Sequence, residues 1–283
     1  MGQTVQLCCI IKERGIMNNN IDLNVVRGKS VLVGTPMYGG LNFANYFESM
    51  LRLSIFCAKE NIKMGMTYIT SESLIQRGRN EIAKQFMDGE YDYLFFIDGD
   101  ISFDHIDFIH AVYIAATNPD KQIVVGPYPH KTIVWDRIQK AKELGLINDE
   151  SDYMKYSGRY GINFYGEKRE ISLAEPIEIK DGSTGFMLIS REVFEKFYEA
   201  YPEQKYKNSK TNEEMFAYFD CKIDPIDNTY LSEDYFFTRW AKKIGYGTWL
   251  MPWVKLQHMG SMLFTGSFVD FAKLNKAIDD NLE

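Results

Sequence analysis

One segment constrains the fold of this chain more than any other. It is the run YLFFI at 93–97, five apolar residues without alternation. A strand that is covered on both faces has this pattern, and such strands belong to parallel sheets flanked by helices. Asp98, Gly99 and Asp100 follow at once. Because ligands bind at the carboxyl ends of the strands in open α/β sheets, the pattern predicts a site at this edge.

Short β-branched runs alternate with segments of helical spacing along the first half of the chain. The expected strands are 30–34, 66–70, 93–97 and 123–126, and the expected helices cover 43–58, 71–87 and the residues after 104. Phe47, Leu51 and Ile55 fall on one face of the first helix. Ser71 or Ser73 is a suitable cap for the second helix, and Asp104 for the third. This repetition predicts an α/β fold with a mostly parallel central sheet flanked by helices. After about residue 130 the pattern becomes irregular.

Composition narrows the class of protein. With 283 residues, of which 45% are hydrophobic and 25% charged, the chain suits one large α/β domain better than two independent domains. A net charge of −7 counts against a protein that holds duplex DNA chiefly through its phosphates. The four cysteines form no CxxC pair, and no apolar run approaches the roughly 18 residues of a membrane span. We therefore expect a soluble, cytoplasmic protein with reduced thiols.

The two aspartates after the buried run suit a divalent metal. Carboxylate oxygens are hard ligands for Mg²⁺ or Mn²⁺, and such a metal bridges readily to a diphosphate. Gly99 would permit a sharp turn between Asp98 and Asp100. The alternative is a solvated acidic turn. Other nucleotide-binding signatures, GxGxxG and GxxxxGK[ST], are absent from the sequence.

Several short motifs are spread over about 30–265, and their order and spacing are characteristic. They are Thr35-Pro36-Met37-Tyr38, Arg77-Gly78-Arg79-Asn80, Asp98-Gly99-Asp100, Gly185-Phe186-Met187, Ser232-Glu233-Asp234 and His258. In this order and spacing the chain resembles the GT-A superfamily of glycosyltransferases, and within it the soluble enzymes of phages and large viruses. The resemblance implies a GT-A (Rossmann-like) fold with irregular insertions on the acceptor side. It also implies a nucleotide-diphosphate sugar as donor.

The resemblance assigns roles to particular residues. The donor-binding set is Thr35, Pro36, Tyr38, Arg79, Asn80, Asp98, Gly99, Asp100 and Lys131, and the metal ligands are Asp98, Asp100 and His258. An imidazole beside carboxylates favours Mn²⁺ over Mg²⁺. Asp234 is preferred as general base over Glu233, although acidic residues in a first helical turn also offset the helix dipole. Trp135 and Gly185 are expected on the acceptor side.

The same resemblance divides the chain into regions. Residues 1–28 are an N-terminal extension, 29–265 the glycosyltransferase domain, and 266–283 a C-terminal helical tail. Within the domain, 29–128 form the donor half and 129–265 the acceptor half.

The acceptor is the least constrained part of the hypothesis. A hydroxymethylated pyrimidine in viral DNA offers a primary hydroxyl, and an enzyme that reaches it would flip the base. Basic residues that could support DNA binding are Lys131, Arg137, Lys140, Lys142, Lys205, Lys207 and Lys210. A glycan or glycoprotein is the alternative acceptor. A nucleotidyltransferase and an inactive nucleotide-sugar-binding module are the other functions that remain open. The sequence predicts neither membrane binding nor a particular oligomeric state.

Overall fold

The computed structural model describes residues 21–166, 172–209 and 211–280. At its centre is a seven-stranded sheet in the order β2-β1-β3-β7-β5-β10-β6. The strands are β1 (Ser30–Pro36), β2 (Lys63–Ile69), β3 (Tyr93–Ile97), β5 (Ile123–Val125), β6 (Ile177–Ile179), β7 (Phe186–Ser190) and β10 (Thr248–Leu250). Five of them run in one direction, whereas β7 and β6 are antiparallel to their neighbours. The predicted mixed α/β fold with a mostly parallel sheet is confirmed.

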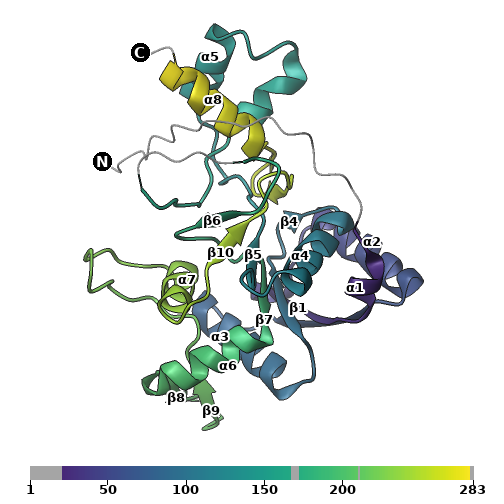
Figure 1. Ribbon diagram of the computed structural model, residues 1–283, viewed down its shortest axis with the longest axis vertical. Helices are drawn as coiled ribbons and strands as arrows, with labels where there is room; N and C mark the ends of the chain where they lie inside the picture. Colours follow the sequence, from purple (N-terminus) through teal and green to yellow (C-terminus); the bar gives the residue numbers. More distant parts are fainter. Residues whose placement is uncertain (1–20, 167–171, 210, 281–283) are drawn as a thin grey trace.

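Helices cover both faces of this sheet (Figure 1). One face carries α1 (Leu23–Arg27), α2 (Ala44–Glu60) and α4 (His105–Thr117), and the other carries α3 (Ile75–Asp88), α6 (Arg191–Ala200) and α7 (Glu233–Lys243). Strand β3 contributes to both cores, because Leu94 and Phe96 pack on the α3 side while Phe95 packs on the α2 side. All five residues of β3 are buried, as its unbroken apolar pattern predicts.

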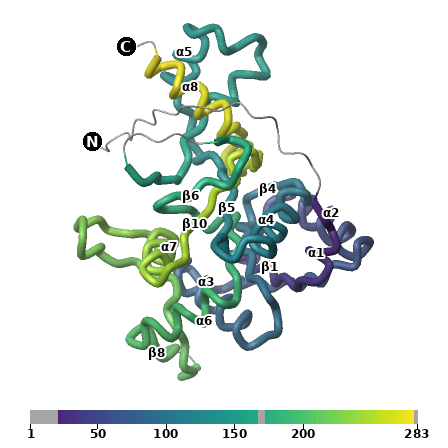
Figure 2. Tube along the Cα trace, in the orientation of Figure 1, coloured from purple at the N-terminus to yellow at the C-terminus, as the bar shows by residue number. Residues whose placement is uncertain are grey.

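Strands from distant parts of the chain meet in the central sheet. Strand β10 pairs in parallel with β5, and β7 pairs with both β3 and β5. The tube in Figure 2 shows β5 and β10 side by side, although they come from opposite halves of the sequence. The two halves expected from the sequence therefore share one sheet.

A second, three-stranded sheet has the order β12-β11-β4. Strand β4 (Ile101–Ser102) pairs with β11 (Gln257–Met259), which pairs in turn with β12 (Leu263–Phe264). A separate hairpin consists of β8 (Lys205–Lys207) and β9 (Glu214–Phe216).

Residues 135–156 and 268–280 form a helical layer beyond the sheet. It contains α5 (Trp135–Glu143) and the 3-10 helix η2 (Glu150–Tyr156), and α8 (Phe268–Asp280) packs against both. Two shorter 3-10 segments, η1 (Tyr38–Gly40) and η3 (Pro202–Gln204), complete the described elements. Figure 1 shows α5 and α8 together, at one end of the molecule.

Helix α2 has two apolar stripes, and the one that the sequence pattern marks is not the one that contacts the sheet. The stripe that contacts the sheet includes Tyr46, Met50, Leu53 and Cys57, which are buried. The stripe that contains Phe47, Leu51 and Ile55 is exposed, at 60%, 49% and 61%. The helix carries two apolar stripes, and spacing alone does not decide which of them faces the sheet.

The structure also bears on two smaller predictions, the cap of α3 and the role of Gly99. Helix α3 begins at Ile75, and the Glu72 carboxylate, rather than Ser71 or Ser73, accepts a hydrogen bond from the Leu74 amide at 3.0 Å. Gly99 does not have a positive φ, and an added Cβ would meet nothing closer than 3.5 Å. The turn between the aspartates therefore does not require glycine. By contrast, Asp104 caps α4 as expected, accepting from the Ile106 amide at 2.8 Å.

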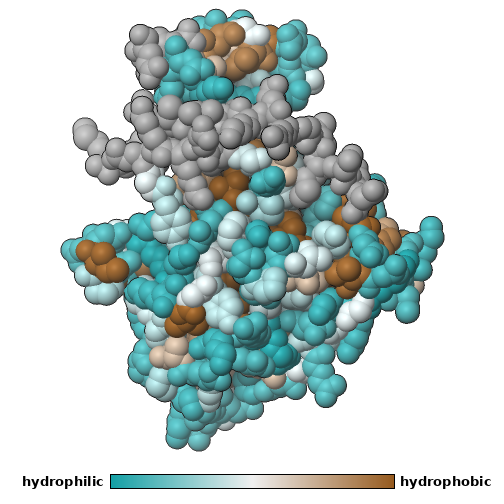
Figure 3. Space-filling model, viewed as in Figure 1, coloured by the Kyte–Doolittle hydropathy of each residue, from teal (hydrophilic) through white to brown (hydrophobic). Residues whose placement is uncertain are grey.

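The described part of the chain contains no helix that is long and apolar enough to cross a membrane. Outside the grey atoms, the face in Figure 3 is mostly hydrophilic, and its hydrophobic residues are scattered.

Candidate active site

The carboxyl end of β3 brings Asp100 and His258 together. Strand β11 pairs with β4 so that His258 lies opposite Ile101, the residue after Asp100. The His258 Nε2 atom lies 3.4 Å from the Asp100 Oδ2 atom. The His258 Nδ1 atom is 2.8 Å from the Pro129 carbonyl oxygen, which can only accept, so Nδ1 donates. In the neutral ring the lone pair is then on Nε2 and faces Asp100.

Lys131 completes this group from the loop that follows β5. Its ammonium lies 2.5 Å from the Asp100 carboxylate. Burial alone would raise the pKa of Asp100. The His258 ring, in the protonated form that donates from Nε2, and the Lys131 ammonium outweigh burial and hold that pKa below its ordinary value. Asp100 is therefore ionised at neutral pH and attracts cations.

The residues at this point fit a divalent metal in part. Asp100 offers a carboxylate, and His258 offers an imidazole nitrogen whose other ring nitrogen is fixed by a carbonyl, the usual second contact of a metal-ligating histidine. Asp98, the third expected ligand, is instead bonded to Arg79. The described residues contain no group of three or more His, Cys, Asp or Glu side chains that could hold a metal ion. The chain thus supplies two ligands, and donor phosphate oxygens would have to complete the set.

Arg79, on α3, is the cation that contacts Asp98 and Glu233. Its side chain is 3% exposed, and its Nη2 atom donates to both Asp98 oxygens, at 3.0 and 3.2 Å. Its Nε atom donates to Glu233 at 3.2 Å. Burial opposes the charged form, but Asp98 and Glu233 outweigh it and hold the pKa of Arg79 above its ordinary value. The Nη1 atom is buried and has no hydrogen-bond partner in the described structure.

The two acids at the start of α7 have different environments. Glu233 is buried and paired with Arg79. Asp234 is partly exposed and accepts from the Ser232 hydroxyl and the Tyr235 amide. Burial, followed by the charge of Glu233, raises the pKa of Asp234 to about 6. A carboxylate with a pKa near the working pH is suited to accept a proton from a hydroxyl.

Tyr128 and Gly185 contact each other, and Gly185 contacts the backbone of Asp98. The Gly185 amide donates to the Tyr128 hydroxyl at 3.2 Å, and the Gly185 carbonyl accepts from the Asp98 amide at 3.0 Å. A Cβ on Gly185 would lie 2.6 Å from the Tyr128 ring, so only glycine fits here. The Tyr128 ring also packs edge-on against His258, with 5.2 Å between ring centroids. Tyr128 belongs to the loop that follows β5, from which the sequence favours Lys131 as the donor contact.

A cleft of about 250 Å³ opens beside the aspartates. It is lined by Pro36, Tyr38, Leu41, Phe43, Ile75, Asp98, Gly99 and Asp100. Five of the residues expected to bind the donor therefore line one cavity. Tyr38 and Leu41 are 72% and 77% exposed at its rim.

Three other expected site residues lie elsewhere. The Thr35 side chain is fully buried, and its hydroxyl is 2.6 Å from that of Tyr46, which leaves only its backbone for a donor. The Asn80 side chain is buried, and its amide both donates to and accepts from the Phe219 backbone, at 2.8 and 2.9 Å. Its evident role is to anchor the chain at Phe219. Trp135, the first residue of α5, is 69% exposed and does not line the cleft.

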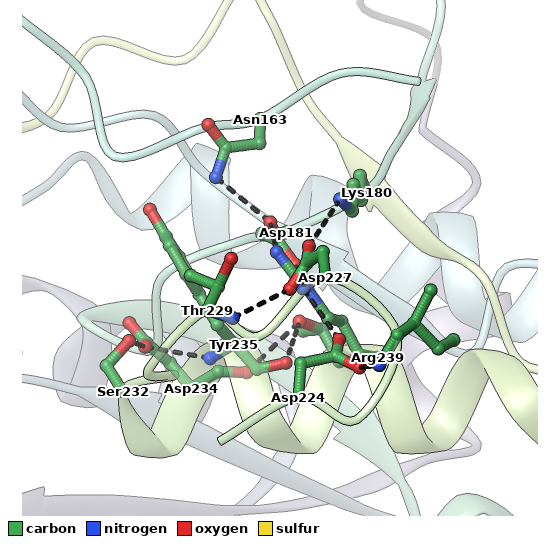
Figure 4. A network of polar contacts seen from close by, with 12 residues as sticks. Asn163, Lys180, Asp181, Asp224, Asp227, Thr229, Ser232, Asp234, Tyr235 and Arg239 are labelled. Atoms are coloured by element: carbon green, nitrogen blue, oxygen red, sulfur yellow. Dashed lines mark hydrogen bonds and ion pairs between the residues drawn. The ribbon is translucent and has the colours of Figure 1, made fainter. Parts of the chain in front are cut away.

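A buried ionic network lies behind Asp234 on α7 (Figure 4). Arg239 donates through Nε and Nη2 to Asp181, at 2.7 and 3.0 Å, and through Nη1 to Asp224 and Asp227, at 2.7 and 3.1 Å. Asp181 is fully buried and also accepts from the Asn163 amide at 2.9 Å. The network ties three separate segments to the helix that carries Asp234. No local sequence motif marks it, because its partners are far apart in the chain.

Comparisons with known proteins give a fold likeness alone. No protein-family model matches the sequence, and no curated protein matches it. Among solved structures, A197 from STIV is 18% identical, with 84% of this chain and 94% of that chain covered and a TM-score of 0.45. A glycosyltransferase involved in the glycosylation of the major capsid of PBCV-1 is 10% identical, with 59% of this chain and 62% of that chain covered and a TM-score of 0.30.

Glucosyl-3-phosphoglycerate synthase from Mycobacterium tuberculosis, in complex with Mg²⁺ and UDP, is also similar. It is 15% identical, with 65% of this chain and 64% of that chain covered and a TM-score of 0.34. This chain therefore spans less than two thirds of the two glycosyltransferases. TM-scores this low carry no argument about the chemistry of the site.

Proposed function

We propose that the chain is a metal-dependent glycosyltransferase that moves a sugar from a nucleotide-diphosphate sugar to a hydroxyl acceptor. One observation supports this function above the others. At the carboxyl end of β3, Lys131 and His258 contact Asp100 and Arg79 contacts Asp98, beside a cleft that both aspartates line. The buried Nη1 atom of Arg79 has no partner in the described structure, and Asp234 lies near Arg79. Such a set can hold a diphosphate and accept a proton from an alcohol.

In this proposal, different residues bind the phosphates, hold the metal and accept the proton. Lys131 and the Arg79 Nη1 atom would bind donor phosphate oxygens, because both are cationic hydrogen-bond donors. Asp100 and His258 would hold Mn²⁺ or Mg²⁺, which when bound neutralises charge on the departing nucleoside diphosphate. Asp234 would take the proton from the acceptor hydroxyl as its oxygen bonds to the sugar. Glu233 is less suited to that role, because it is paired with Arg79.

For the acceptor, the surroundings of the basic residues favour a glycan or glycoprotein over DNA. Lys140 pairs with Glu143 and Lys205 with Glu214. Arg137 bonds to Asn275 and lies over the Phe271 ring, with its guanidinium carbon 4.1 Å from the ring centroid. Lys210 lies outside the described residues. A protein that binds DNA through phosphates needs unpaired cations on one surface. A hydroxymethylated pyrimidine in viral DNA is the second candidate acceptor.

The experiment is a donor panel of UDP- and GDP-sugars, assayed with Mn²⁺ and with EDTA. We expect release of nucleoside diphosphate that depends on the metal. Release of pyrophosphate from a nucleoside triphosphate and a sugar phosphate would instead identify a nucleotidyltransferase. Donor binding without turnover would identify an inactive binding module.

The acceptor is tested in the same reactions. Duplex DNA that contains 5-hydroxymethylcytosine, unmodified DNA and a glycan panel are offered in parallel, and products are identified by mass spectrometry. We expect sugar transfer to the glycans. Transfer to the modified DNA alone would reverse the order of the two acceptors.

A further inference from the structure

A second and larger cavity, about 610 Å³ in volume, lies on the outer side of α3. Its floor includes Tyr68 and Ile69 of β2, an edge strand of the central sheet. Gln85 on α3 forms part of one wall, and Tyr206 of the β8–β9 hairpin forms part of the opposite wall. We call this cavity the α3 groove. Its volume lies within the range of small-molecule binding sites.

The α3 groove is next to the cleft that Asp98 and Asp100 line. The segment from Ile69 to Ile75 contributes to both cavities, since Thr70 lines the groove and Ile75 lines the cleft. The Thr70 carbonyl also accepts from the Gly39 amide at 3.0 Å, which ties the groove to the loop that carries Tyr38. A molecule that occupied the groove could therefore extend to the reaction centre.

The side chains of the α3 groove indicate the chemistry of its ligand. Its charged groups balance, with Glu72 and Glu81 against Arg77 and Lys207, and Arg77 is paired with Glu72 at 2.6 Å. A phosphate-rich ligand would need an excess of cations, which this set does not provide. The remaining lining is rich in hydroxyl and amide groups, and Tyr68, which is 56% exposed, presents an aromatic ring.

Such a lining is suited to a neutral, hydroxyl-rich molecule. Hydroxyls and amides both donate and accept hydrogen bonds, as sugar hydroxyls do. Aromatic rings pack against the apolar faces of sugar rings and keep a polar edge in contact with water. We propose that the α3 groove binds the non-reacting part of an oligosaccharide acceptor. This inference rests on the proposed function, because it assigns the acceptor class to the same enzyme.

The test compares acceptors of different length. Tyr206→Ala and Tyr68→Ala are assayed with a monosaccharide and with longer oligosaccharides of the same sugar. For the double variant we expect the acceptor KM to rise about tenfold for the longest oligosaccharide, on the scale of lost aromatic contacts. The KM for the monosaccharide and for the donor should not change. Phe47→Ala is the matched control, since Phe47 is an exposed aromatic residue on the opposite face of the sheet.

Three results would overturn the inference. An equal effect on short and long acceptors would give the tyrosines a general structural role. A higher donor KM would make the α3 groove a nucleoside site, and salt-sensitive binding of DNA that the variants lose would make it a nucleic-acid site.

Binding without catalysis separates this inference from the proposed function. Calorimetric titration of the oligosaccharides into the protein, without donor, should give binding that the double variant loses and Phe47→Ala retains. Binding of this kind in a protein that releases no nucleoside diphosphate would reject the proposed function and keep the groove. Release of nucleoside diphosphate without oligosaccharide binding would reject the groove alone.

Discussion

Two arginines, Arg79, which is buried, and Arg239, which is partly buried, show how differently the same side chain is used in two regions of this molecule. Arg239, on α7, bonds through all three of its nitrogens to Asp181, Asp224 and Asp227. Arg79, on α3, bonds through Nε and Nη2 to Glu233 and Asp98, but its Nη1 is buried and without a partner in the described structure. A buried donor without a partner costs free energy in the absence of a ligand.

The difference separates a structural ion network from a binding site. A guanidinium whose donors are all used can hold segments together but has nothing left to offer a ligand. An unused donor that lies beside partly exposed aspartates can bind an anionic ligand such as a phosphate. This difference supports the proposal that Arg79 binds the donor, whereas Arg239 holds together the segments that contact α7.

The largest expected effect concerns α7, which carries Arg239 and contacts Arg79 through Glu233. Asp234→Asn keeps the size of the side chain but cannot accept a proton, so kcat should fall roughly 10²–10⁴-fold while donor KM stays nearly constant. The pKa of Asp234 is raised to about 6, so the folded protein binds its proton more tightly than the unfolded chain does. The ionised carboxylate therefore destabilises the fold at neutral pH, and the variant should be at least as stable as the wild type.

Glu233→Gln is the matched control for this variant. It removes a charge from the neighbouring residue but leaves Asp234 in place. If Glu233→Gln causes the larger loss of kcat, the roles of the two acids are reversed. If neither variant changes kcat, both acids only stabilise the start of the helix.

The next prediction compares the arginines directly. Lysine keeps the positive charge but lacks the planar fork of donors. Arg79→Lys should lower kcat/KM for the donor by about 10²-fold, as the loss of one donor aimed at developing charge often does. Arg239→Lys should leave the kcat/KM of folded protein close to wild type and lower the free energy of unfolding by about 1–3 kcal/mol. Steady-state kinetics and thermal unfolding measure both, and an identical pattern in the two variants would remove the distinction.

His258 gives a smaller expected effect. His258→Ala removes one of the two metal ligands that the chain offers, so the Mn²⁺ affinity should fall roughly 10–100-fold. A titration of activity against Mn²⁺ measures this change. His130→Ala is a suitable control, because it removes a nearby imidazole that has not been assigned to the site. An unchanged Mn²⁺ requirement in His258→Ala would exclude His258 from the metal site.

The smallest expected effect is a pH dependence. Because the proposed base must be ionised, kcat should fall about tenfold for each pH unit below the Asp234 pKa of about 6 and stay level just above it. Measurements from pH 5 to 8 in constant ionic strength give the profile. The acid limb should be absent from the residual activity of Asp234→Asn, and its persistence there would assign it to another group.

The sequence predicted the framework of the fold better than the details of the site. The unbroken apolar pattern of Tyr93–Ile97 is decisive because both faces of the strand must be buried. The cap at Asp104 is equally local. The face of α2 was not predictable in this way, since both of its stripes are apolar and the choice depends on what the sheet presents to the helix.

The sequence predicted the site residues that belong to a motif. It missed those that only the tertiary structure brings together. Pro36, Tyr38, Asp98 and Asp100 line one cleft, as their motifs indicate. Asn80 belongs to such a motif too, but its amide is used by the Phe219 backbone. Asp181 and Arg239 are 58 positions apart, so no periodicity connects them. The metal site and the catalytic role of Asp234 remain predictions.

The pairing of β4 with β11 has a consequence for biosynthesis. It joins Ile101 to His258, so the proposed ligand pair of Asp100 and His258 forms only after residue 258 has been synthesised. Contacts between such distant residues form slowly, because a long loop must close first. A nascent chain that already carries Asp98 and Asp100 still lacks His258, and it would not bind the metal through this pair. Folding of residues 29–128 alone would therefore leave the proposed metal site incomplete.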